Sequence, residues 1–343
     1  MPILEQHEVA GYLLARGLVA RRSIVDGSLR VVDATSRNRN FRVSGAAGES
    51  LLLKQGLAAD AGESLENEAA LYLRLTQAGG ALAAAIPRLH GFDADRELLI
   101  LEWVAGAEDL YRHHAGRRRC SVRLSSALGR VLAALHAVQV DEHDEELRRD
   151  APWVLSLHRP RLEALRYLSA PSIELIAAIQ RDPPFARALD ELRDGWRVEA
   201  LVHRDVKWAN CIVRAPAAIM LVDWEMAGWG DPALDVGSAL GEFLGWQLRR
   251  AGSSVARGTD PAPAALWRAY ARARGLGDGG GDAAVSLRVR AAAYAGARLL
   301  QSAYEKTQET GRSSDRVRRT LALAREVLLA PDRVAGELLG GAG

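Results

Sequence analysis

Residues 201–225 read Leu-Val-His-Arg-Asp-Val-Lys-Trp-Ala-Asn-Cys-Ile-Val-Arg-Ala-Pro-Ala-Ala-Ile-Met-Leu-Val-Asp-Trp-Glu, with a polar loop between two short apolar runs. The loop carries its polar side chains at fixed offsets: His203, Arg204, Asp205, Lys207 and Asn210. The pattern predicts a hairpin after the loop, with strands at Cys211–Val213 and Ile219–Val222 and a turn at Ala215-Pro216. The second strand ends by presenting Asp223, so polar groups are expected at both ends of one hairpin.

These residue types suit phosphoryl transfer, in which a protein mainly positions groups and neutralises charge. Asp205 is the candidate base that orients an acceptor hydroxyl and takes its proton, and Lys207 can reach the transferred phosphoryl group as a mobile point charge. Asn210 and Asp223 can offer a carbonyl and a carboxylate oxygen to Mg²⁺, a hard cation. A surface turn would explain a lone His-Arg-Asp, but the full set between two strands favours a catalytic centre.

A family resemblance rests on two further segments. Asp223-Trp224-Glu225, followed by Gly230-Asp231-Pro232-Ala233-Leu234-Asp235-Val236-Gly237, resembles the aminoglycoside phosphotransferase and choline kinase family, and the resemblance covers most of residues 20–250. It implies an α+β, bilobal protein-kinase-like fold, with a small antiparallel-sheet N-lobe at residues 1–104 and a larger, mostly helical C-lobe at residues 105–343. It also implies that ATP and Mg²⁺ bind between the lobes. Asp235 matches the buried aspartate that holds the catalytic-loop backbone in that family.

The catalytic loop departs from the usual family pattern. The family usually reads His-Gly-Asp, whereas this chain has Arg204 before Asp205 and a lysine at position 207, as in Ser/Thr protein kinases. Among 45 lysines and arginines only three are lysines, Lys54, Lys207 and Lys306. The guanidinium group of arginine is planar and extended, so it does not easily replace the compact ammonium that lysine carries on a flexible aliphatic chain. Two of the three lysines therefore stand where kinase chemistry needs an ammonium.

The N-terminal region is predicted to contain a leading helix at residues 4–16 and then a small antiparallel sheet. The expected strands, with a turn at Asp26-Gly27 between the first two, are Ile24-Val25, Leu29–Val32, Phe41–Val43 and Leu51–Leu53. The last strand ends at Lys54, as the matching kinase strand does.

A helix from Ser64 to Gln77, with Ser64 as its N-cap, is expected to carry the partner of Lys54. The resemblance implies that Glu68 pairs with this lysine and that the pair clamps the α- and β-phosphates of the nucleotide. Glu66 is the rival candidate for the acid.

The turn at residues 35–40 corresponds to the hairpin that covers the phosphates in kinases, but it contains no glycine. Its backbone amides, helped by Ser36 and Asn38, can still cap phosphates, and a plain polar hairpin tip is the equally open alternative. The apolar strand at residues 98–104 matches the kinase hinge, so the resemblance places adenine at backbone groups near Glu102 and Val104.

The C-terminal region is predicted to be mostly helical. One amphipathic helix spans residues 124–138, and His136 near its end is interpreted as a core or capping histidine. Further helices are expected within residues 141–200, after Asp231 as the cap of a helix that begins at Pro232, and at residues 284–305 and 314–329.

Composition excludes several classes of protein. The net charge of +2 gives no strong field for nucleic acid, and no apolar window is long enough to cross a bilayer. The two cysteines form no disulfide framework or metal motif, which predicts a reducing, cytoplasmic location, and the N-terminus lacks a signal-peptide pattern.

The sequence therefore predicts a kinase that uses ATP and Mg²⁺, and it leaves the acceptor open. The lysine two residues after the base favours Ser or Thr hydroxyls of a ribosomal precursor peptide, phosphorylated ahead of elimination in lanthipeptide-like maturation, with a lyase as partner. The arginines of the C-terminal helices would then hold an acidic leader segment, or they merely solubilise those helices: Arg288, Arg290, Arg298 and the set Arg316, Arg318 and Arg319. A small-molecule hydroxyl, on an aminoglycoside or amino alcohol, is the alternative, and a pseudokinase scaffold is the lesser one.

Overall fold

The computed structural model describes residues 3–35, 38–46, 48–56, 61–139, 147–214, 217–251, 260–277 and 281–340. The chain forms two compact units, each with its own internal packing. The first unit contains Met1–Glu108, Ile212–Ala215 and Met220–Glu225, and the second contains Asp109–Cys211, Pro216–Ile219 and Met226–Gly343. The expected α+β class is confirmed, since the first unit is built on an antiparallel sheet and the second is mostly helical.

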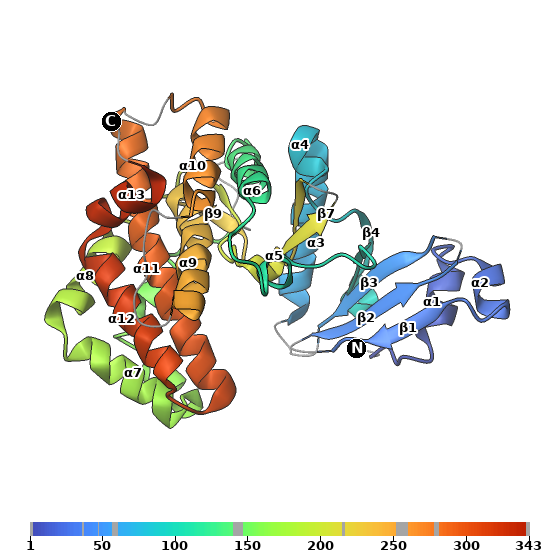
Figure 1. Cartoon of the computed structure of the whole chain (residues 1–343). Helices are drawn as coiled ribbons and strands as arrows, with labels where there is room; N and C mark the ends of the chain where they lie inside the picture. The colour runs from blue at the N-terminus through green and yellow to red at the C-terminus, as the bar shows by residue number, and fades with distance from the viewer. Residues whose placement is uncertain are drawn as a thin grey trace. The chain divides into compact units, whose positions relative to one another are not determined.

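A five-stranded antiparallel sheet in the order β1-β2-β3-β5-β4 forms the first unit (Figure 1). Its strands are β1 (Arg30–Asp33), β2 (Arg39–Ser44), β3 (Ser50–Gln55), β4 (Leu89–Asp93) and β5 (Leu98–Glu102). Alternate residues of the central strands bury one face, where Phe41, Val43, Leu53 and Ile100 belong to the hydrophobic core. Lys54 lies opposite Asn40 on β2 and Leu99 on β5, in the middle of the sheet.

One long helix, α3 (Ala61–Ala78), and shorter elements accompany this sheet: α1 (Val9–Ala15), α2 (Arg21–Val25), α4 (Gly80–Ala83) and the 3₁₀ turn η1 (Ala94–Arg96). Three sequence expectations need correction here. The leading helix begins only at Val9, because the chain before it is tied to the sheet through the Leu4 amide and the Gln55 side chain, 2.9 Å apart.

The segment predicted as a strand at Ile24-Val25 is the end of helix α2. Tertiary contacts override its β-branched composition, because the Ser23 hydroxyl donates to Glu49 at 2.5 Å and turns this segment into a helical corner. Helix α3 begins at Ala61, so Ser64 lies inside the helix and is not its N-cap.

The second unit contains a set of packed helices and 3₁₀ turns (Figure 1). They are α5 (Leu110–His114), α6 (Val122–Leu135), η2 (Trp153–Ser156), η3 (Leu162–Tyr167), α7 (Ala170–Gln180), α8 (Pro183–Asp194), η4 (Trp208–Asn210), α9 (Pro232–Ala251), α10 (Ala262–Ala273), α11 (Asp282–Thr310), α12 (Asp315–Leu329) and α13 (Pro331–Leu339). Helix α9 packs closely on α11 because Gly237 has no side chain; a Cβ there would collide with the backbone oxygen of Ala291. The helix α13 was not predicted.

Short strands flank the polar loop. Strand β6 (Ala200–Val202) pairs antiparallel with β9 (Gly228–Gly230), which the sequence pattern did not reveal. Strands β7 (Cys211–Arg214) and β8 (Ala218–Leu221) form the predicted hairpin, whose turn at Ala215-Pro216 lies outside the described residues. No helix in the described part of the chain has the length and apolar character needed to span a membrane.

Candidate active site

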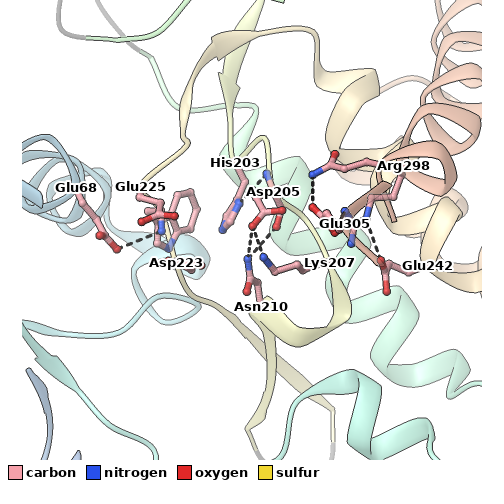
Figure 2. Close-up of polar contacts among 12 residues, drawn as sticks. Glu68, His203, Asp205, Lys207, Asn210, Asp223, Glu225, Glu242, Arg298 and Glu305 are labelled. Atoms are coloured by element: carbon pink, nitrogen blue, oxygen red, sulfur yellow. Dashed lines mark hydrogen bonds and ion pairs between the residues drawn. The ribbon is translucent and has the colours of Figure 1, made fainter. Parts of the chain in front are cut away.

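Asp205, Lys207 and Asn210 form one hydrogen-bonded group in the second unit. The Lys207 ammonium donates to Asp205 Oδ2 at 2.6 Å, and the Asn210 amide nitrogen donates to the same oxygen at 3.0 Å. Figure 2 shows both side chains pointing at the Asp205 carboxylate. The Asn210 nitrogen also donates to the Asp205 backbone oxygen at 3.0 Å, which orients its carbonyl oxygen away from the carboxylate. The predicted loop residues are thus brought together.

Buried side chains on both sides of Asp205 hold this loop in shape. Trp208 is fully buried, and its ring packs against His114 and Phe243 at centroid distances of 4.6 and 5.2 Å. His203 is also fully buried, and its Nδ1 accepts the Asp205 amide at 3.3 Å. Because these anchors are buried and packed, they hold the polar loop in place.

Asp235 on α9 holds the backbone just before Asp205. Its carboxylate accepts the amides of His203 at 2.7 Å and Arg204 at 2.9 Å, so one buried acid captures two successive N–H groups. The sequence interpretation of His136 as a core histidine missed that it completes this arrangement. The His136 ring bridges Asp235 at 3.2 Å and the Tyr270 hydroxyl at 3.0 Å.

Replacing Asp235 with asparagine is expected to lower stability at neutral pH by roughly 1–3 kcal/mol, because an amide group would face N–H donors in a buried site. Burial alone would raise the pKa of Asp235, but the His136 hydrogen bond and the nearby His charges outweigh it, so the pKa lies below its ordinary value. The stabilising contribution is therefore present above the unfolded pKa and is lost as pH falls through the folded pKa.

Thermal unfolding of wild-type and Asp235→Asn protein between neutral and acid pH measures this contribution. The wild type should lose more stability than the variant as the pH falls below about 4, the range of an ordinary aspartate. If the stability of the two proteins falls equally as the pH is lowered, the role given to the Asp235 carboxylate is contradicted.

A second polar group lies in the first unit and centres on Lys54. Its ammonium donates to Glu68 at 2.9 Å, to Asp223 at 3.0 Å and to Glu225 at 3.2 Å. The Lys54 side chain is 9% exposed and that of Glu68 only 1%. Glu68 rather than Glu66 is thus the acid that pairs with Lys54, and its second oxygen accepts the Trp224 amide at 3.3 Å. Figure 2 shows the acids of this group, Glu68, Asp223 and Glu225.

The charges of this group keep Lys54 protonated. Burial would lower the pKa of Lys54, but the carboxylates of Glu68, Asp223 and Glu225 outweigh burial and raise it above its ordinary value. Burial raises the pKa of Glu68, and the Lys54 ammonium only partly offsets that effect. The group therefore carries a surplus of negative charge around one fixed ammonium, which is a suitable environment for a divalent cation beside phosphates.

Asp223 has the properties of a metal ligand. Its side chain is 35% exposed, so one side of the carboxylate is open, and its backbone lies in the left-handed region at φ 69°. Strained backbone of this kind concentrates at functional sites. No cluster of three or more His, Cys, Asp or Glu side chains able to hold a metal ion occurs among the described residues. Mg²⁺ does not need one, because it usually takes one or two protein oxygens with phosphates and water.

The predicted nucleotide-contact residues have different positions in the first unit. Glu102 ends strand β5; its amide donates to the Arg88 oxygen at 2.8 Å, and its carboxylate pairs with Arg214 at 3.2 Å. The Val104 carbonyl accepts the Ala107 amide at 3.2 Å. Asn38 precedes strand β2 at the hairpin tip, and Ser36 lies outside the described residues. The roles given to all four residues stay predictions.

Polar residues that sequence reasoning missed, or gave another role, gather around Arg298. The Arg298 guanidinium is buried, donates to Glu242 at 3.0 Å and lies 3.6 Å from Glu305 (Figure 2). Burial lowers its pKa, but Glu242, Glu305 and Asp205 outweigh this effect and raise it. No local signal marks such a group, because Glu242 comes from α9 whereas Arg298 and Glu305 come from α11.

Two more of the arginines proposed to hold an acidic segment, both on α11, also have internal partners. Arg290 donates to Asp231 at 2.8 Å, and Arg288 donates to the Gly340 backbone oxygen. With Arg298, these side chains pair within the protein, whereas the rest of the proposed set, Arg316, Arg318 and Arg319, is exposed on α12.

The comparisons with known proteins agree with this geometry. The sequence model of the phosphotransferase enzyme family (APH) matches residues 28–284, which is more than half of the chain. A search of curated protein sequences found no match. Solved structures with the same fold include choline kinase from Cryptosporidium parvum Iowa II, with a TM-score of 0.62, 12% identity and coverage of 96% of this chain and 96% of that chain.

Further structures with the same fold include an ethanolamine kinase and an aminoglycoside phosphotransferase. Plasmodium vivax ethanolamine kinase has a TM-score of 0.59 and 13% identity, and covers 92% of this chain and 86% of that chain. Aminoglycoside phosphotransferase APH(2'')-Ib has a TM-score of 0.55 and 16% identity, and covers 98% of this chain and 100% of that chain. The expected protein-kinase-like fold and the family resemblance are both confirmed. The chain therefore belongs to the phosphotransferase enzyme family and is a kinase whose acceptor group is a hydroxyl.

Proposed function

We propose that this kinase transfers the γ-phosphoryl group of ATP to its acceptor with Asp205 as the base. The observation that carries this assignment is the convergence of Lys207 and Asn210 on one Asp205 oxygen, at 2.6 and 3.0 Å. A carboxylate held between a mobile ammonium and an amide has a defined orientation, which is what alignment of an acceptor hydroxyl requires.

The reaction follows from these roles. The acceptor hydroxyl donates a hydrogen bond to Asp205, its oxygen forms a bond to the γ-phosphorus, and the bond from that phosphorus to the leaving oxygen of ADP breaks. The hydroxyl proton passes to Asp205. Lys207, whose ammonium already lies at the carboxylate, neutralises charge on the transferred phosphoryl group.

Nucleotide and metal binding are assigned to the first unit and to Asn210. Lys54, held by Glu68, would contact the α- and β-phosphates, and adenine would bind backbone groups near Glu102 and Val104. Asn210 and Asp223 would supply oxygen ligands to Mg²⁺, which when bound neutralises phosphate charge. The solved structure of APH(2'')-Ib, a protein of the same fold, contains ADP, which supports a nucleotide as donor.

A small alcohol that carries one positive charge is the acceptor that the second unit supports best. Trp153 and Tyr304 form an aromatic pair at a centroid distance of 5.3 Å, and Glu305, the residue after Tyr304 on α11, is 37% exposed and accepts a hydrogen bond from Gln301 at 2.8 Å. Aromatic faces and a carboxylate together bind ammonium groups. Arg298 offsets one of the two neighbouring acids, which disfavours a polycation. Choline and ethanolamine kinases have the same fold.

A Ser or Thr hydroxyl of a precursor peptide is the second candidate, with a lyase as partner in the later elimination. The Lys207 ammonium at 2.6 Å from Asp205 supports it, since the same lysine suggested a protein substrate. Of the arginines proposed to hold a leader segment, Arg288, Arg290 and Arg298 pair within the protein, whereas Arg316, Arg318 and Arg319 are exposed on α12. The free, buried thiols of Cys120 and Cys211 support the proposal of a reducing, cytoplasmic location.

Phosphate incorporation measured by mass spectrometry tests these assignments. The protein is incubated with ATP and Mg²⁺ and with choline, ethanolamine, aminoglycosides or Ser/Thr peptides with acidic leaders. Phosphate on an amino alcohol is the expected result. Phosphate on a peptide alone would establish the second candidate, and turnover that does not require Mg²⁺ would contradict the metal assignment.

Replacing Glu305 with glutamine is expected to raise the KM for an amino-alcohol acceptor about tenfold with little change in kcat, because a charge that binds ground state and transition state alike is removed. Glu309→Gln is the matched control on the same helix, since Glu309 is exposed and pairs with Lys306. Equal effects of the two substitutions would contradict the acceptor site.

A further inference from the structure

Arg204, the residue before Asp205, has an unusual backbone conformation. Its φ of 67° lies in the left-handed region, where the Cβ of an L-residue crowds the following carbonyl. Among the described residues other than glycine only Glu97 and Asp223 share a positive φ. Such a conformation persists only where the surrounding structure imposes it.

Two backbone hydrogen bonds to Asp235 impose this conformation. Its carboxylate accepts the His203 amide at 2.7 Å and the Arg204 amide at 2.9 Å. Successive N–H groups can converge on one anion when the backbone adopts a turn that includes a left-handed residue. Glycine would adopt this turn without strain, so an arginine here needs a compensating interaction.

The side chain of Arg204 makes that interaction. It is 4% exposed, and its Nη2 donates to the Asp150 backbone oxygen at 2.9 Å and lies 3.4 Å from the Asp150 carboxylate. The guanidinium carbon lies 5.7 Å from the centre of the Trp196 ring. A planar guanidinium suits both contacts at once, which an ammonium would not.

The partners of Arg204 are fastened to the sheet that delivers the loop. Arg148 pairs with Gly228 on β9, and the Arg148 oxygen accepts the Trp229 amide at 2.8 Å. The Trp196 indole donates to the Arg149 oxygen at 2.8 Å. Strand β9 pairs with β6, which runs directly into His203. The anchor is therefore rigid with respect to the turn that it holds.

We propose that Arg204 is a positioning residue for Asp205, with its guanidinium anchored on Asp150 and Trp196 so that the strained left-handed turn stays closed on Asp235. The inference rests on the proposed function, because it gives Asp205 the part of the base. Arginine thus does two things at this position: it strains the turn and it supplies the contact that offsets the strain.

Three substitutions separate these two effects: Arg204→Ala, Arg204→Gly and Arg204→Lys. Alanine keeps the strain and loses the anchor, and should lower kcat about tenfold or more with a KM for ATP within about twofold of wild type. Glycine relieves the backbone strain but also lacks the anchor, so the kcat of Arg204→Gly should be at least about threefold above that of Arg204→Ala. Lysine keeps a positive charge but cannot stack as a planar group on Trp196, so the kcat of Arg204→Lys should lie between those of Arg204→Ala and the wild type. Turnover is measured as the phosphate released from ATP in the presence of Mg²⁺ when water takes the place of the acceptor.

Glu97 supplies the matched control, since it shares the positive φ and lies outside the polar groups described above. Glu97→Ala and Glu97→Gly should differ in melting temperature by about 2–4 °C and leave kcat unchanged. Equal kcat values for Arg204→Ala and Arg204→Gly, or a wild-type kcat in Arg204→Ala, would overturn the proposal.

Hydrogen exchange gives a readout that does not depend on turnover. Amides in a peptide covering residues 203–205 should exchange faster in Arg204→Ala than in Arg204→Gly and slowest in the wild type. Unchanged exchange in Arg204→Ala would overturn the anchoring role. Absence of phosphate transfer from ATP to any acceptor by the wild type would contradict the proposed function alone, and the exchange data would still decide the case of Arg204.

Discussion

Replacing Asp205 with asparagine is expected to lower the rate of phosphoryl transfer by about 10²–10⁴-fold, the usual contribution of a positioned general base. Asparagine has nearly the same shape but cannot take the proton of the acceptor hydroxyl. It also loses the charge that attracts the Lys207 ammonium at 2.6 Å. Steady-state turnover with ATP and Mg²⁺ measures the effect.

The fold and the nucleotide affinity of this variant should change little, because Lys54 and its partners belong to the first unit and are left intact. Thermal unfolding and titration with ATP check this expectation. Asp194→Asn is the control, since Asp194 is also an aspartate that pairs with a basic side chain, Arg193, but at the end of helix α8. Undiminished turnover in Asp205→Asn would show that another group is the base.

Replacing Lys54 with methionine is expected to damage both nucleotide use and stability. The ammonium is the shared partner of Glu68, Asp223 and Glu225, and Glu68 is almost completely buried. Removing one member of a buried ion pair costs roughly 3–5 kcal/mol, because the remaining charge has no compensation. ATP affinity should fall about 100-fold or more, as the loss of a charge-assisted phosphate contact implies. Calorimetric titration and thermal unfolding measure the two effects.

A second substitution separates stability from function. Lys54→Met combined with Glu68→Gln removes the buried charge and keeps an acceptor for the Trp224 amide, so it should recover much of the stability without recovering ATP affinity. Lys306→Met is the control, because Lys306 is exposed and pairs only at the surface with Glu309. Wild-type ATP affinity in Lys54→Met would contradict the clamp.

Much of the catalytic loop could be predicted from sequence because its chemistry is local. Asp205, Lys207 and Asn210 lie within six residues, and the short strand before them leaves few ways to arrange their side chains. The pairing of Lys54 with Glu68 was expected from the family resemblance, with Glu66 as the rival, and the structure selects Glu68. These predictions depended on residue type and spacing over one strand, one turn or one helix.

Local pattern failed where distant contacts override propensity. The apolar pair Ile24-Val25 has strand composition, yet Ser23 and Glu49 make this segment helical. The three-residue strand β9 has no periodicity to recognise, and only its pairing with β6 defines it. Arg290 and Arg298 look like surface charge in the sequence, and their acidic partners lie 59 and 56 residues away.

The sequence by itself therefore determined the fold class and the family, and it supplied the candidate site residues, because each depends on the types of residue and their order along the chain. The tertiary structure alone decided how the base is held. The amides before Asp205 reach a carboxylate 31 and 32 residues away on α9, and His136 and Tyr270 support that carboxylate from two further helices. The left-handed turn at Arg204 belongs to the same class of feature, since its φ is a consequence of the Asp235 contact. Pairings of this kind depend on which surfaces meet when the helices pack, and no local pattern of residues encodes that.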